Sequence, residues 1–404
     1  MTSVRTDTPD ILVIGGGIIG TAVARELNRR YVDAQVVVLD KELTGHAHGS
    51  GRNSGVLHAG FYYTADSHKA AFTRQGNRRL TEYCLERNLP LNRCGKLVVT
   101  RSESELEALD ELKRRGEVNG VDLEVLTEAQ ARAIEPRAKT VERALFSPNT
   151  DTVDPMAVVE AMQADAIGEG VIWRRGVSYQ GRDGDQVLTS DGVLTPGFVV
   201  NTAGLYADVI ARDFGFSERY RILPFKGLYL YADSQEAPLA CHIYPVPDLG
   251  NPFLGVHFTL TVDGRTKLGP TATPAFWREQ YQGFENFSWR ELLDILGRQT
   301  GLFFRSEFDF KRLAVRELRK LQRGHLLDLS RALISDLDAK RYPSWGRAGI
   351  RAQLLDVSER RLVMDFVFEG DARSFHVLNA VSPGFTCSLP FADHVCDQIA
   401  TLWR

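Results

Sequence analysis

The stretch Ile11-Leu12-Val13-Ile14-Gly15-Gly16-Gly17-Ile18-Ile19-Gly20 decides the fold of this chain. Its four leading apolar residues predict a strand that is buried on both faces. The glycines behind them have the spacing Gly-x-Gly-x-x-Gly: Gly15 permits a tight turn, Gly17 lets a pyrophosphate approach the backbone, and Gly20 lets helix and strand pack closely. A helix that begins at this turn offers free N–H groups and partial positive charge to phosphates.

The residues that follow complete a β-α-β unit. A helical pattern runs from Ile18 to about Arg30, and a second apolar strand, 36–39, ends in Asp40. Asp40 lies about 20 positions beyond the last glycine, where a dinucleotide-binding unit has the acid that accepts hydrogen bonds from the ribose hydroxyls. The combination predicts a dinucleotide site rather than a glycine-rich turn without a ligand.

Composition narrows the class of protein. The chain has 404 residues, 43% hydrophobic and 25% charged, with a formal net charge of −3. This length allows two domains, and the charge predicts no nucleic-acid partner. Five scattered cysteines without zinc spacing predict no metal site, and no secretory signal is visible at the N-terminus, so we expect a cytoplasmic protein.

Three further segments indicate contact with a large cofactor. The loop 44–60 is rich in Gly, Ser, Asn and His, where a nicotinamide enzyme usually continues with another β-α element. The strand that begins at Phe198 runs into Ala203-Gly204, a second place where the backbone can meet a cofactor. The final helix, predicted to begin near Thr386, directs its N-terminus at the loop from Ser382, where it can stabilise negative charge.

These residues carry a resemblance to a known family. The opening glycine motif, the loop Asn53-Ser54-Gly55-Val56-Leu57-His58-Ala59-Gly60 and the strand Cys94-Gly95-Lys96-Leu97 resemble the D-amino-acid-oxidase-type flavoproteins. The runs Tyr244-Pro245-Val246-Pro247 and Gly255-Val256-His257-Phe258-Thr259 are most similar to the L-2-hydroxyglutarate dehydrogenase/oxidase family within that superfamily. The chain departs from that family at Arg52 and around Gly384-Phe385, which bears on the substrate more than on the cofactor.

The resemblance implies an α/β fold with two domains. A Rossmann-like FAD-binding domain would comprise 1–85, 148–216 and 342–404, interrupted by an α+β substrate domain, 86–147 and 217–341, built on an antiparallel or mixed sheet. The predicted FAD contacts are Gly15, Gly17, Ile18, Gly20, Asp40, Lys41, Ser50, Arg52, Asn53, Ser54, Val177, Ala203, Gly204, Gly384 and Thr386.

The implied reaction is oxidation of a small L-2-hydroxy acid, such as L-2-hydroxyglutarate, to the 2-oxo acid by hydride transfer to flavin N5. His257 or His58 would be the base that takes the hydroxyl proton. Lys226, Arg351 and Arg52 are candidates for binding carboxylates, with Tyr244 as a hydroxyl donor. The alternatives are oxidation of an amine or amino acid, and a flavin-binding module without turnover.

The electron acceptor is open between oxygen and a membrane quinone. Residues 311–323 read as one cationic helix, with basic side chains outward and Leu318 and Leu321 packed beneath. Such a helix predicts either an ordinary solvated face or a peripheral contact with the inner face of a membrane.

Overall fold

The computed structural model describes residues 7–234, 236, 238–248, 254–305 and 310–403. The chain forms two compact units: unit 1 comprises 1–53, 155–224 and 351–404, and unit 2 comprises 54–154 and 225–350. The predicted domain limits differ at 148–154 and 342–350, which lie in unit 2, at 217–224, which lies in unit 1, and over the longest stretch at 54–85, which lies in unit 2. The reason is that β3 (Val56–Leu57) and β4 (Leu91–Asn92) both pair with β8 (Asp151–Val153), which ties this segment to unit 2.

Unit 1 is built on a six-stranded sheet of order β23-β24-β13-β1-β2-β9. Its strands are β1 (Ile11–Ile14), β2 (Val36–Asp40), β9 (Ile172–Arg175), β13 (Phe198–Asn201), β23 (Val367–Gly370) and β24 (Ser374–Asn379). All neighbours run parallel except β23 beside β24. β1 is buried along its whole length, as its apolar sequence predicts.

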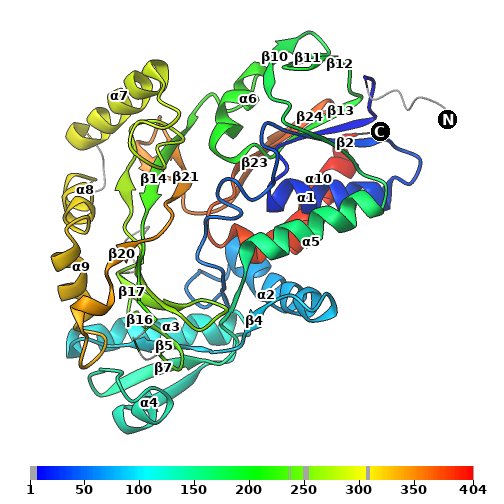
Figure 1. Cartoon of the computed structure of the whole chain (residues 1–404). Coiled ribbons are helices and arrows are strands. Elements are labelled where there is room, and N and C mark those ends of the chain that lie inside the picture. Colours follow the sequence, from blue (N-terminus) through cyan, green and yellow to red (C-terminus); the bar gives the residue numbers. More distant parts are fainter. Residues whose placement is uncertain (1–6, 235, 237, 249–253, 306–309, 404) are drawn as a thin grey trace. The chain divides into compact units, whose positions relative to one another are not determined.

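Helices and a small second sheet accompany this sheet. The helices are α1 (Ile18–Arg30), α5 (Pro155–Gly168), α6 (Ala207–Asp213) and α10 (Gly384–Leu402), and the small sheet contains β10 (Tyr179–Asp183), β11 (Gln186–Thr189) and β12 (Gly192–Leu194). α1 packs against both α5 and α10 (Figure 1). Leu12 and Ile14 of β1 pack on the other face with Val187 and Ile210 from the β11 and α6 layer.

Unit 2 contains an eight-stranded mixed sheet of order β20-β15-β18-β17-β16-β5-β7-β6. Its strands are β5 (Lys96–Val99), β6 (Glu124–Thr127), β7 (Arg143–Ser147), β15 (Leu230–Tyr231), β16 (His242–Pro245), β17 (His257–Leu260), β18 (Thr266–Gly269) and β20 (Ser344–Trp345). Only β5 and β16 pair in parallel. The Rossmann-like unit and this mixed sheet confirm the predicted fold class.

The remaining elements of unit 2 are mostly helical. They are α2 (His68–Glu86), α3 (Leu106–Val118), α4 (Glu128–Ile134), α7 (Trp289–Arg305), α8 (Phe310–Arg319), α9 (Arg323–Ser330), two 3-10 turns (Glu103–Glu105 and Ala339–Arg341) and the short strand β19 (Thr273–Pro274). β14 (Tyr220–Gly227) and β21 (Gly349–Asp356) run from one unit into the other, and the short strand β22 (Arg361–Leu362) pairs with β21. Within the described part of the chain, no helix is long and apolar enough to span a membrane.

The sequence-based view of 311–323 as one helix on packed leucines is wrong. α8 ends at Arg319 and α9 begins at Arg323. Leu318 and Leu321 are 49% and 43% exposed. Lys320, expected on the solvated face, is instead buried in an ion pair with the buried Glu317 (2.7 Å), which also accepts a hydrogen bond from the backbone of Ala272.

Candidate active site

The glycine turn of unit 1 is packed so closely that side chains do not fit. Gly15 has φ +103°, and a Cβ there would lie 2.6 Å from the carbonyl oxygen of Thr202, the residue directly after β13. At Gly20 a Cβ would lie 1.9 Å from the Gly15 oxygen. The turn therefore exposes backbone rather than side chains at the start of α1, which fits the approach of a pyrophosphate.

Two polar side chains hold this turn in shape. Asp40 at the end of β2 accepts hydrogen bonds from the Gly16 amide (2.7 Å) and the Glu42 amide (2.8 Å), and burial raises the pKa of its carboxyl. Ser50 accepts from the Ile18 amide at 2.9 Å. Each carboxylate oxygen keeps a further lone pair, so Asp40 can still accept from a ribose hydroxyl.

The other predicted FAD contacts also gather in unit 1, with one exception. The Cα of Ala203 is 2.8 Å from the Cβ position of Gly15, and the Val177 amide donates to the Asp40 carbonyl at 3.0 Å. Gly384 begins α10, with Thr386 buried in its first turn. The exception is Ser54, the first residue of unit 2.

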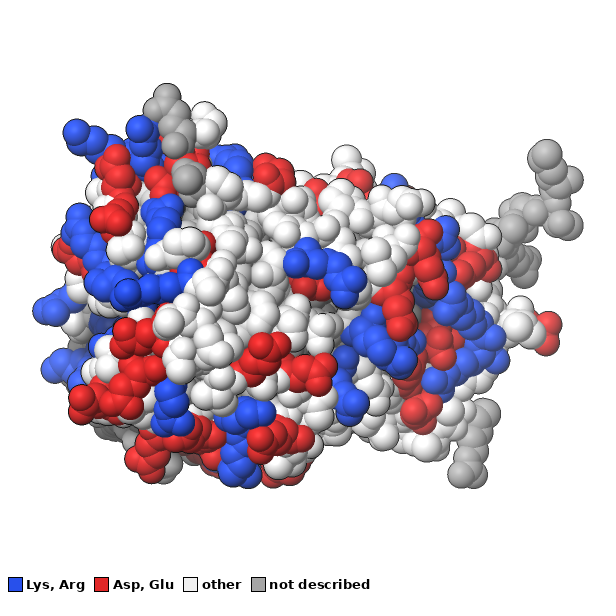
Figure 2. Space-filling model, turned by 90° about the horizontal axis from the view of Figure 1, so that it is seen from below, with Lys and Arg blue, Asp and Glu red and all other residues white. Residues whose placement is uncertain are grey.

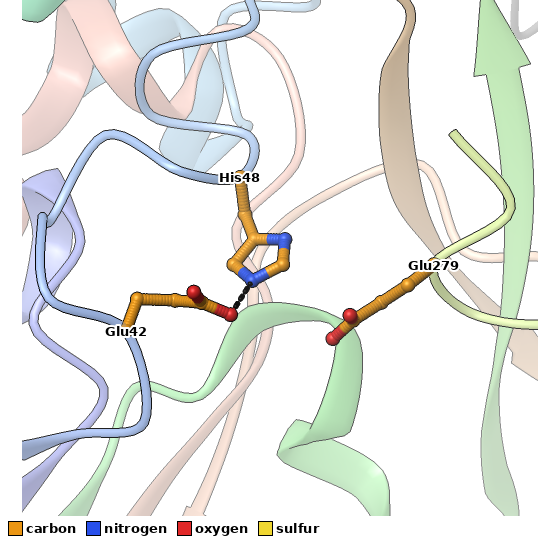
Figure 3. A group of neighbouring side chains, drawn as sticks. All are labelled: Glu42, His48 and Glu279. Carbon is orange, nitrogen blue, oxygen red and sulfur yellow. Dashed lines mark hydrogen bonds and ion pairs between the residues drawn. The ribbon is translucent and has the colours of Figure 1, made fainter. Parts of the chain in front are cut away.

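The loop after β2 is held by its own side chains. Arg52 donates from Nε to the Ala47 carbonyl (2.6 Å), and Asn53 donates to the Ser50 carbonyl (2.7 Å). Figure 3 shows the hydrogen bond between His48 and Glu42, whose Nε2 and Oε1 atoms are 2.9 Å apart. Glu279 in the same figure belongs to unit 2, and we assign no metal site to this group.

Unit 2 carries a set of buried basic and aromatic side chains on one face of its large sheet. Because side chains alternate along a strand, the registers of β5, β16, β17 and β18 place them on the same face. We name as the basic cluster Lys96, His242, Tyr244, His257 and Lys267, all of which are buried. The opposite face is apolar and forms a core with Leu97, Ile243, Phe258 and Leu268.

His257 has the geometry of a proton acceptor. Its Nδ1 lies 2.8 Å from the Gly255 carbonyl oxygen, and a carbonyl only accepts, so Nδ1 carries the proton and Nε2 is the acceptor. The ring stacks on Tyr244 with 3.7 Å between centroids. Burial lowers the pKa of His257 well below 6.5, with smaller contributions from His58 and Lys96. The imidazole is therefore neutral near pH 7.

The other two histidines of this region differ from His257. Both ring nitrogens of His242 have hydrogen-bond partners. Nδ1 accepts from the Leu260 amide (3.0 Å), and Nε2 lies 3.0 Å from the Thr152 hydroxyl. That hydroxyl itself donates to the Leu260 carbonyl. His58 is buried after β3, and its charge interacts with those of His242 and His257. The structure thus brings both predicted bases, His58 and His257, into unit 2.

Two lysines of the basic cluster were not predicted as site residues. Lys267 donates to the Ser54 carbonyl at 2.7 Å, and burial lowers its pKa to about 8. Lys96 was noted only as part of a family motif; burial lowers its pKa to about 7. For Lys96, the available signal was a lysine at the head of an otherwise apolar strand.

The predicted carboxylate anchors do not belong to this sheet. Lys226 is half-buried on β14, opposite Thr273 of β19, and burial lowers its pKa. Arg351 lies on β21 and is half-buried in unit 1, whereas Lys226 is in unit 2. Figure 2 shows Lys and Arg intermixed with Asp and Glu on the face drawn, in keeping with the small net charge.

Comparisons with known proteins show what this chain is similar to. The model of a family described as FAD dependent oxidoreductase matches residues 10–398. L-2-hydroxyglutarate dehydrogenase of Escherichia coli strain K12 is 34% identical over 400 residues, 97% of this chain and 93% of that protein. The mitochondrial L-2-hydroxyglutarate dehydrogenase of Nematostella vectensis is 37% identical over 420 residues, 97% of this chain and 90% of that protein.

Solved structures share the fold at lower identity. The L-alpha-glycerophosphate oxidase of Mycoplasma pneumoniae, solved with FAD bound, has a TM-score of 0.77 and 20% identity, covering 98% of this chain and 95% of that chain. Glycine oxidase of Geobacillus kaustophilus has a TM-score of 0.72 and 19% identity, covering 99% and 96%. The predicted family resemblance and the FAD cofactor are confirmed by these findings.

Proposed function

We propose, since this chain belongs to the family of FAD-dependent oxidoreductases, that it oxidises a small L-2-hydroxy acid of the L-2-hydroxyglutarate type to the 2-oxo acid. The observation that carries the substrate class is the name shared by its relatives over nearly the whole chain. The amine of Lys267 in unit 2 supports it, because its pKa of about 8 leaves it mostly protonated near pH 7 and a hydroxy-dicarboxylate is an anion.

FAD, when bound, supplies the hydride acceptor, and the residues of this chain bind, orient and deprotonate the substrate. His257 is the proposed base, receiving the hydroxyl proton at Nε2, which its bond to Gly255 leaves as the acceptor. His58 is the second candidate. General-base assistance of this kind is worth roughly 10²- to 10⁴-fold in rate.

Three cations and one phenol are the proposed substrate contacts. Lys226 and Arg351 would bind carboxylates, Arg as a bidentate partner and Lys as a point charge. Arg52 donates from Nε to the Ala47 carbonyl, and its guanidinium is the third proposed contact for a carboxylate or for the cofactor. Tyr244 would donate its hydroxyl.

The test is anaerobic mixing of the purified, FAD-containing protein with a panel of substrates while the flavin absorbance is followed. L-2-hydroxyglutarate should bleach the flavin, and its D-enantiomer and L-glutamate should not. Bleaching by glycine or another amino acid, with none by any hydroxy acid, would favour the amine-oxidising alternative. Bound flavin that no substrate reduces would favour a binding module.

We also propose a location and an electron acceptor. The protein would be cytoplasmic, would contact the membrane peripherally and would pass electrons to a membrane quinone; oxygen is the alternative acceptor. The supporting observation is a solvent-facing apolar stripe on α7, formed by Trp289 (69% exposed), Leu293 (68% exposed) and Leu296. These residues recur at helical spacing and so share one face. Such a stripe is typical of interfacial helices.

Charge on the adjoining helix supports the same contact. The exposed charged side chains among the described residues of α8 are all basic, because its acid Glu317 is buried; they are Lys311, Arg312, Arg316 and Arg319. Flotation with vesicles should show binding to anionic but not to zwitterionic lipid. The double variant Leu293→Ser, Leu318→Ser should lose it, and Val193→Ser, an exposed apolar residue of unit 1, should not. Equal flotation of all three proteins would reject the contact.

A further inference from the structure

Lys96 occupies an unusual environment in the middle of unit 2. Its side chain is fully buried on β5, and its Nζ has no hydrogen-bond partner among the described residues. Three aromatic rings surround the amine instead, with centroids 4.5 Å (Phe61), 4.6 Å (Tyr62) and 4.9 Å (Tyr244) from Nζ. A cation at these distances is attracted by the faces of the rings.

One of these rings connects Lys96 to His257. Tyr244 lies on β16, which runs between β5 and β17, so Lys96 and His257 approach its ring from the two neighbouring strands. The imidazole stacks on the ring at 3.7 Å with an interplanar angle of 14°. The three side chains thus form a continuous Lys96–Tyr244–His257 stack.

We propose that Lys96 is a positioning residue for the reaction: its amine holds Tyr244 against His257, and its positive charge adds to the effect of burial in disfavouring protonation of that imidazole. This inference rests on the proposed function, in which His257 is the base. Lys96 itself, enclosed by rings, is not assigned contact with the substrate. Lys96 lies in the run Cys94 to Leu97 that resembles the family and is not among the predicted FAD contacts, so this proposal gives it a separate role.

The charges around His257 determine the sign of the effect. Tyr244 and His242 face it from β16, Lys267 shares its face from β18, Tyr229 makes an edge contact at 6.3 Å, and His58 adds a charge interaction. These neighbours supply cations or neutral groups and no acid. Removing the positive charge of Lys96 therefore makes His257 easier to protonate.

The size of the effect follows from the stack. The contacts of 4.9 Å from the amine to the Tyr244 ring and 3.7 Å from that ring to the imidazole place the two charges at most about 9 Å apart. At an effective dielectric constant of about 20, one charge then shifts the other's pKa by about one unit. Lys96 is still charged where His257 titrates, because the pKa of Lys96 is about 7 and that of His257 is lower than 6.5.

The experiment compares Lys96→Met, which keeps the length of the side chain without its charge, with Lys96→Arg, which keeps the charge. The FAD-loaded proteins are labelled at histidine, and the His257 ring resonances, assigned with His257→Gln, are followed by NMR across pH. The acid limb of the pH profile of kcat/KM is measured in parallel. Lys340→Met removes an exposed charge of unit 2 as a control.

In Lys96→Met both the His257 midpoint and the acid limb should rise by about one pH unit, whereas Lys96→Arg and Lys340→Met should leave them near the wild-type values. An unchanged His257 midpoint in Lys96→Met would overturn the inference. Slower turnover in both Lys96 variants without a change of the His257 midpoint would also overturn it, because Lys96 would then act through packing alone. Full activity of His257→Gln would instead reject His257 as the base, while the NMR midpoint still measures the coupling.

Discussion

Gly20→Ala sets two opposing effects against each other. Alanine in place of glycine within a helix usually stabilises by about 0.5–1 kcal/mol. At Gly20, however, the new Cβ would lie 1.9 Å from the Gly15 oxygen, more than 1 Å inside the closest contacts that real Cβ atoms make. That oxygen cannot retreat easily, because Thr202 donates to it (2.8 Å) and the Gly15 amide is bound to Leu39 (2.8 Å).

The overlap must therefore push α1 away from the turn. Overpacking of this kind costs about 1–3 kcal/mol, so after the gain from replacing glycine we expect a net loss of stability of about 0–2.5 kcal/mol. The amides at the start of α1 move with the helix, and losing one charge-assisted hydrogen bond costs about 1.5–3 kcal/mol, or about 10- to 150-fold in FAD affinity. The loss of FAD affinity should exceed the loss of stability.

The measurements are urea unfolding of the apoprotein and FAD titration by flavin fluorescence. Gly168→Ala is the matched control, since Gly168 ends α5 in the same unit and a Cβ there meets nothing within 4 Å. It should be neutral or slightly stabilising and leave FAD affinity unchanged. If Gly20→Ala binds FAD as tightly as the wild type and is equally stable, the steric argument for this glycine is refuted.

Three further predictions concern unit 2 and the substrate contacts. Lys96→Met should raise the free energy of unfolding most below pH 7, and the gain should shrink toward pH 10.5. The folded chain holds this amine at a pKa of about 7 against an ordinary 10.5, so the cost of burying its charge is complete below pH 7 and fades above it. Equal gains at pH 6 and pH 10 in urea melts would contradict this. His257→Gln should slow anaerobic flavin reduction by roughly 10²- to 10⁴-fold with FAD retained, and His58→Gln should have a smaller effect, whereas near wild-type rates in both variants would mean that histidine is not the base. Lys226→Ala and Arg351→Ala should each lower kcat/KM by about 10- to 150-fold, and an unchanged value in both would remove them as carboxylate anchors.

The sequence alone determined the cofactor unit, because its signals are local. Gly15, Gly20 and Asp40 lie within a single β-α-β segment, and the steric needs of a tight turn and of close helix packing fix their spacing whatever the rest of the chain does. The structure accordingly places strand, turn, helix and acid where the sequence predicts them. His257 could also be named from sequence, although only as one of two candidate bases.

Tertiary structure alone decided the composition of the basic cluster. Its members come from strands that start at Lys96, His242, His257 and Thr266, and they share a face only because the non-local registers of these strands align. A shift by one residue would turn any of them into the apolar core, and no local pattern fixes that register. The same limit explains why Leu318 is exposed although the sequence predicts that it is packed. Periodicity tells which side chains share a helix face, but only the packing of the whole unit decides which face meets water.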